Sequence, residues 1–136
     1  MSGVAVVRFV LANNAAVVAQ VPAARIMAGI LPISTTLPAI GVSLVDTRER
    51  TNVAMDMSTI HSTARVQVTV LGQTYVQART VIELVRKALG YQRGSINGVD
   101  VDSILPDDEG PDFRDPDTGV HQSSRDYFVR FNVATA

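Results

Sequence analysis

The residues of this 136-residue chain with the clearest chemical potential lie between Asp107 and His121, in the stretch DDEGPDFRDPDTGVH. Six acidic side chains and one histidine fall within it, and clustered carboxylates are the ligands that hard divalent cations prefer. The spacing does not follow the calcium-loop pattern, because Gly119 is misplaced and no acidic residue closes the loop. The sequence therefore favours a solvated connection, turned by Pro111, Pro116 and Gly119, and predicts no metal or cofactor.

Other catalytic groups are sparse. The chain has two histidines, His61 and His121, and no cysteine, which is too little for a zinc site unless carboxylates complete it. No serine lies in a G-x-S-x-G setting, and the glycines do not form a phosphate-binding loop. We therefore expect no enzyme. A small metal-dependent hydrolase that uses the acidic stretch with His121 stays as the alternative from a different class.

Charge is distributed unevenly along the chain. Eight acids lie between Asp100 and Asp117 against Arg114 alone, whereas the whole chain has a net charge of −1, so the remaining residues are net basic. No basic cluster with interleaved aromatics appears, which argues against a direct reader of nucleic acid. The absence of cysteine means that nothing in the chain depends on an oxidising compartment, and a cytosolic origin is the default.

Composition predicts one globular domain over residues 1–136, since 46% of the residues are hydrophobic and 18% are charged. Alternating apolar residues predict strands over 39–45, 64–71, 99–105 and 124–133. Thr74 and Gln77 form a capping box before an amphipathic helix that reaches Leu89, and a short helical pair precedes the first strand, with Asn13 or Asn14 as a cap. We therefore expect an α+β fold in which the long helix packs on one face of a mainly antiparallel four-stranded sheet.

Two segments lack such a pattern. Residues 46–63 are polar and aperiodic, which predicts a long hairpin arm or loop, and residues 106–121 form the acidic loop. Long loops on a compact scaffold commonly carry docking surfaces, and methionine adapts to irregular partners. The candidate docking residues of the first loop are Arg48, Arg50, Met55 and Met57.

The order of these segments resembles the tail completion proteins of long-tailed phages, also called head-to-tail joining or tail terminator proteins. The similarity is carried by PAARI, by LPISTTLPAIGVSLV, by HSTARVQVTVLGQTYVQARTVIELVRKAL, by GSINGVDVDSILPDDEGPDF and by DPDTGVHQSSRDYFVRF. It covers nearly the whole chain. The valine strand, the T-Y-x-x-A helix, the G-V-x-V strand and the closing D-x-x-T-G-x-H-x-x-S-x-D-Y strand are distinctive together, although no single motif is specific.

This resemblance implies a non-enzymatic virion component that is assembled in the host cytoplasm. It would form a ring, of six subunits, at the head-proximal end of the tail tube, end the growth of the tube and join the tail to the filled head. Its partners would be other copies of itself, the tail tube protein and a head-completion or connector protein, while DNA passes through without specific binding. Another neck or tail structural role is the alternative.

Within such a ring the two loops acquire candidate roles. Residues 45–63 would reach a neighbouring subunit or the tube. The acidic loop has two open interpretations: it lines a weakly repulsive DNA channel, or it faces a basic patch on the adjacent subunit that includes some of Arg48, Arg50 and Arg65. The acidic residues concerned are Asp107, Asp108, Glu109 and Asp112.

Overall fold

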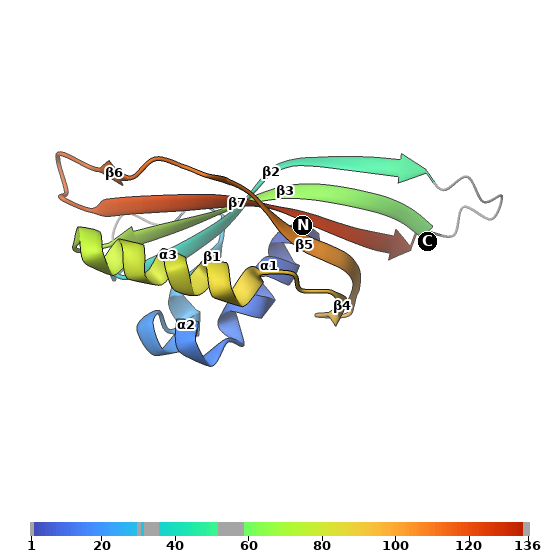
Figure 1. Ribbon diagram of the computed structural model, residues 1–136, viewed down its shortest axis with the longest axis horizontal. Coiled ribbons are helices and arrows are strands. Elements are labelled where there is room, and N and C mark those ends of the chain that lie inside the picture. Colours follow the sequence, from blue (N-terminus) through green and yellow to red (C-terminus); the bar gives the residue numbers. More distant parts are fainter. Residues whose placement is uncertain (1, 30, 32–35, 52–58, 135–136) are drawn as a thin grey trace.

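The computed structural model describes residues 2–29, 31, 36–51 and 59–134 (Figure 1). Its helices lie on one side of a curled sheet, whose other face is left open. The helical elements are α1 (Ser2–Ala12), α2 (Ala15–Gln20), a 3-10 turn (Ala23–Arg25) and α3 (Tyr75–Leu89). The strands are β1 (Ile26–Ala28), β2 (Ala39–Thr51), β3 (Thr59–Gly72), β4 (Gly94–Ile96), β5 (Val99–Glu109), β6 (Phe113–Arg114) and β7 (His121–Ala134).

The sheet has seven strands in the order β1-β2-β3-β7-β5-β4, with β6 paired to β7 outside this path. It is mixed, because β1 runs parallel to β2 while the other pairs are antiparallel. The expected α+β domain with a four-stranded antiparallel sheet and one long helix is therefore wrong: the molecule is strand-rich and its helices are short. The three-residue strands β1 and β4 and the two-residue β6 are too short to produce a periodic sequence signal.

Both expected loops also contain strand, and the first is mostly strand. β2 continues to Thr51 and β3 begins at Thr59, so the expected loop at 46–63 contracts to residues 52–58, which lie outside the described residues together with Met55 and Met57. β5 runs to Glu109 and β6 interrupts the expected loop at 106–121. The strands extend because the neighbouring strands β3 and β7 continue beside them and supply backbone hydrogen-bond partners.

Helix α3 provides much of the contact between the two layers. The Thr74 hydroxyl accepts a hydrogen bond from the backbone N–H of Gln77 at 3.1 Å, as the sequence predicts. Gln77 reaches back to the N–H of Gln73, one residue earlier than a capping box requires. The buried face of the helix packs against β3 and β7 and consists of Ala78, Val81, Ile82, Val85, Ala88 and Leu89.

The N-terminal helices complete the apolar layer. Asn14 caps α2, because its Oδ1 accepts hydrogen bonds from the N–H groups of Ala16 and Val17, both at 3.1 Å. Val6, Val7 and Leu11 of α1 are fully buried against the sheet and the other helices. Among the described residues, no helix is both long and apolar enough to span a membrane.

Candidate functional site

The first part of the acidic stretch binds an arginine of its own chain. The Nε and Nη2 atoms of Arg65, on β3, donate to Oδ2 of Asp126 on β7 at 3.0 and 2.7 Å. Asp107 of β5 lies 3.2 Å and Asp108 3.9 Å from the same Nη2 atom. The hydrogen bonds that Arg65 donates to Asp126 are the main reason that the pKa of Arg65 is raised. Three neighbouring strands are thus tied together on the open face of the sheet.

The second part of the stretch binds the first turns of α3. Arg79 Nη1 lies 2.6 Å from Oε1 of Glu109 and 3.4 Å from Oδ1 of Asp112. The Tyr75 hydroxyl donates to Oδ2 of Asp112 at 2.9 Å, and the Ser123 hydroxyl donates to Oδ1 at 2.8 Å. Ser123 is buried at the start of β7. These contacts fix the connection between β5 and β7 against the helix.

The Asp112 carboxylate is stabilised in its charged form. Its pKa lies below the ordinary value of 3.8, first because of the hydrogen bond from Ser123 and further because of Tyr75 and Arg79, while partial desolvation opposes the shift. A carboxyl group whose pKa is lower in the folded state contributes stability above its unfolded-state pKa, and this contribution is lost as the pH falls through that range.

We therefore expect Asp112→Asn to reduce the acid sensitivity of folding. The free energy of unfolding should fall less between about pH 7 and about pH 3 in this variant than in the wild type. Ser123→Ala should act in the same direction, since it removes the principal hydrogen bond but keeps the carboxyl group. Urea unfolding at both pH values measures the difference, and equal pH dependence in all three proteins would contradict the assignment.

The two histidines lie far apart in the fold. His121 packs edge-on against the ring of Tyr75, with 6.2 Å between ring centroids, and His61 Nδ1 lies 3.3 Å from Asp102 and 3.2 Å from Asn132. Within the ranges that the structure describes, no three acidic or histidine side chains converge as a metal site would require. Four carboxylates of the acidic stretch instead lie next to arginine, tyrosine or serine side chains: Asp107, Asp108, Glu109 and Asp112.

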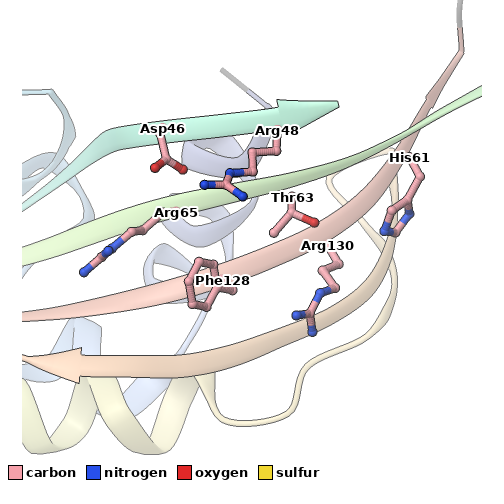
Figure 2. Close-up of a pocket in the computed structure, with 7 residues that line it drawn as sticks. All are labelled: Asp46, Arg48, His61, Thr63, Arg65, Phe128 and Arg130. Carbon is pink, nitrogen blue, oxygen red and sulfur yellow. The ribbon is translucent and has the colours of Figure 1, made fainter. Parts of the chain in front are cut away.

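A basic groove, of about 430 Å³, lies on the open face of the sheet (Figure 2). Three neighbouring strands line it: β2, β3 and β7. Arg48 is paired in register with Thr63, and Thr63 with Arg130, so the two arginines flank one threonine across the sheet. The full lining is Asp46, Arg48, His61, Thr63, Arg65, Phe128 and Arg130.

The paired ends of β2 and β3 project as a hairpin arm, which comprises residues 45–51 and 59–63 together with residues 130–134 at the end of β7, which pair with β3 (Figure 1). Arg48 and Arg50 both belong to it; the side chain of Arg50 lies outside the description. A hollow of about 270 Å³ lies on its helix side, lined by Gly3, Thr47, Glu49, Ile60, Ser62, Phe131 and Val133. Val45 and Val133 are exposed at 51% and 36%, so apolar surface is available on the arm.

Sequence reasoning had identified Arg48 and the acidic residues but not the groove. The alternation in the last strand does place Phe128 and Arg130 on one face, away from the core positions. The alternation does not give the pairing register between strands. This register brings Arg130 next to Thr63, which lies 67 positions earlier in the chain. Local patterning therefore predicts which side chains share a face of the strand, but it does not predict which strands lie side by side.

The fold of the chain is similar to that of a chain in a solved structure. A chain from a solved structure described as "Virion of native gene transfer agent (GTA) particle" superposes with a TM-score of 0.72 at 14% sequence identity, over 96% of this chain and 94% of that chain. The model of the family described as tail completion protein gp17 matches residues 5–132, and the chain belongs to that family. No curated protein matches the sequence.

Family membership confirms the resemblance inferred from the sequence. The chain is a viral structural protein of the phage tail, and its place is the tail or neck of the virion. Assembly with other tail or head proteins follows from that location. The arginine-bound acidic stretch, the basic groove and the hairpin arm are therefore interpreted below as parts of an assembling protein.

Proposed function

We propose that this protein, as a single domain over residues 1–136, forms a six-subunit ring at the head-proximal end of the tail tube. The ring ends tube growth and joins the tail to the filled head, and the protein has no catalytic role. The observation that carries this proposal is the match of residues 5–132 to the tail completion family. The partners are the tail tube protein and a head-completion or connector protein, with DNA passing through the ring without specific binding.

The hairpin arm supports an assembly role. It carries the exposed apolar side chains of Val45 and Val133, which are available for contact with another protein. We assign it to contact with the neighbouring subunit of the ring. Arg48 and Arg50 lie on the arm, and Met55 and Met57 fall in the segment that joins its strands, outside the described residues.

The acidic stretch has a structural role within its own subunit in this proposal. Asp107, Glu109 and Asp112 hold the β5–β7 connection to Arg65 and Arg79. The side chain of Asp108 is 80% exposed, and its Oδ2 atom lies 3.9 Å from Nη2 of Arg65. It is the acid among these four that is best placed to face a DNA channel or a neighbouring subunit.

The native mass of the purified protein, measured together with negative-stain images, tests the proposed ring. We expect closed rings with a central hole, either in solution or at one end of purified tail tubes after mixing. Rings at the tube end that stop further tube growth would support a terminating role. A protein that stays monomeric and leaves tube ends unoccupied would contradict the proposal.

A further inference from the structure

The basic groove carries more positive than negative charge, counted over the residues that the structure describes. Three arginines line it against one aspartate, Asp46. Arg65 is engaged by Asp126 and Asp107, but among the residues that the structure describes no carboxylate lies within 4.0 Å of the guanidinium groups of Arg48 or Arg130. Their backbones are two strands apart, or roughly 10 Å. A carboxylate that enters between them would therefore be flanked by two cations.

An ordered acidic turn, residues 115–119, lies at the other end of the molecule. Oδ1 of Asp115 accepts a hydrogen bond from the backbone N–H of Asp117 at 2.9 Å. The carbonyl of Asp115 accepts one from the N–H of Gly119 at 2.8 Å. Gly119 has a φ of +74°, which favours glycine at this position. The turn presents the exposed Asp117 on a rigid support, so little conformational entropy is lost when it binds.

We propose that the basic groove of one subunit receives the acidic turn of the next subunit in the ring. This inference rests on the proposed ring function and names the contact that closes the ring. Figure 1 places the turn between β6 and β7 at one end of the sheet and the hairpin arm at the opposite end. Two different patches at opposite ends of one chain are what a head-to-tail ring contact requires. Their opposite charges give the contact its direction.

The charges on the open face favour a protein carboxylate over DNA as the occupant. Asp46 lies in the groove itself, and Asp107 and Asp126 lie beside it around Arg65. Surfaces that bind DNA phosphates are instead predominantly basic over a wide area. A confined groove in which Arg48 and Arg130 have no carboxylate partner among the described residues is suited to a small, defined acidic segment such as the turn.

Charge exchange between the two patches tests this contact. We expect Arg48→Glu/Arg130→Glu to raise the ring dissociation concentration at least about tenfold, because it places like charges opposite each other. Asp117→Arg should also weaken the ring. The triple variant, which carries both changes, should assemble at least about threefold more tightly than the groove variant, since opposite charges face each other again. Sedimentation of each protein over a concentration series gives the ring dissociation concentration. If rings form only on tail tubes, the fraction of occupied tube ends is compared instead.

The matched control is Lys87→Glu/Arg93→Glu, which reverses two exposed charges at the end of α3 and before β4. It changes the net charge by the same amount and should assemble like the wild type. Thermal unfolding of every variant establishes that the domain is folded. Recovery in the triple variant cannot come from a misfolded chain.

The outcomes separate this contact from the ring itself. If the wild type forms neither rings nor tube caps, the proposed function fails and the contact fails with it. If wild-type rings form and the groove variant assembles equally well, the contact is wrong and the ring stands. Absence of any recovery in the triple variant would rule out the turn as occupant. Loss of duplex DNA binding by the groove variant, with unchanged assembly, would overturn the proposal in favour of a phosphate-binding role.

Discussion

Replacing Ile82 with alanine should lower the free energy of unfolding by about 2–5 kcal/mol. Ile82 lies in the middle of α3, is fully buried, and belongs to the face that packs on β3 and β7. The truncation removes apolar contacts and leaves a cavity between two layers that cannot fully collapse. A loss of this size lowers the ratio of folded to unfolded molecules by a factor of roughly 30 to several thousand. Urea unfolding measures it, at one protein concentration for all samples because assembly also stabilises the fold.

Val76→Ala is the matched control on the same helix. Val76 is 72% exposed, so its truncation should change the free energy of unfolding by less than about 0.5 kcal/mol. The slope of the unfolding free energy against urea should stay constant in both variants, as expected when the native fold is retained. A loss below about 1 kcal/mol for Ile82→Ala, or equal losses for both, would mean that α3 does not pack as described.

The parts of the fold that could be predicted are those with one buried and one exposed face. Val66, Val68 and Val70 alternate with polar residues because their strand has helices on one side only, and they are fully buried. The apolar period of α3 and its Thr74 cap were equally visible in the sequence. Tyr75 follows the same apolar spacing as the buried face of α3 but is 50% exposed, because its hydroxyl reaches Asp112.

The sequence predicted a hairpin arm or loop over 46–63 but not the extent of its strands, and the reason is physical. Thr47 and Glu49 point to the helix side but line an open hollow at the start of α1 and are exposed to water, so they need not be apolar. Hydrophobic alternation arises only where one face is buried. A bulge between Leu44 and Asp46 also shifts the register, which breaks the alternation at the point where the arm begins.

The end of α3 shows a smaller failure of local rules. A glycine after a helix commonly closes it in the left-handed conformation, but Gly90 has a φ of −61° and Tyr91 has the positive φ, +59°. Gln92 donates its side-chain amide to the carbonyl of Ala88 at 3.2 Å, and the N–H of Ile104 bonds to the Gln92 carbonyl. Contacts to β5 thus determine how the chain leaves the helix, and they are not visible in the local sequence.

In the candidate site, the local sequence shows the acidic stretch, whereas the pairing of distant strands determines which side chains it contacts. The acidic stretch was visible as composition, but its partners Arg65 and Arg79 lie some 30 to 40 positions earlier in the chain. Arg65 meets Asp126 only because β3 and β7 pair with a register that places them on one face of the sheet. An interpretation based on composition could therefore propose a metal, a channel wall or an interface with equal justification. The contacts give the stretch a role in holding the fold.

The hairpin arm yields the largest expected effect on assembly. Val45→Asp and Val133→Asp should each raise the ring dissociation concentration at least about 100-fold, because a carboxylate buried in an apolar contact costs several kcal/mol and each 1.4 kcal/mol is tenfold in affinity. Both valines are exposed in the single subunit, at 51% and 36%, so the domain itself should stay folded. Sedimentation measures ring formation and electron microscopy measures tube capping.

Tyr91→Asp serves as the control for added charge on an exposed apolar position. Tyr91 is 78% exposed in the connection between α3 and β4, away from the arm, and this variant should assemble normally. Loss of rings in the two arm variants with retained folding would show that the arm contacts a neighbouring subunit. Normal rings that no longer cap tubes would assign the arm to the tube instead of the neighbour. Rings and capping at wild-type levels in both arm variants would remove the arm from assembly altogether, since a desolvated carboxylate at a real contact cannot be silent.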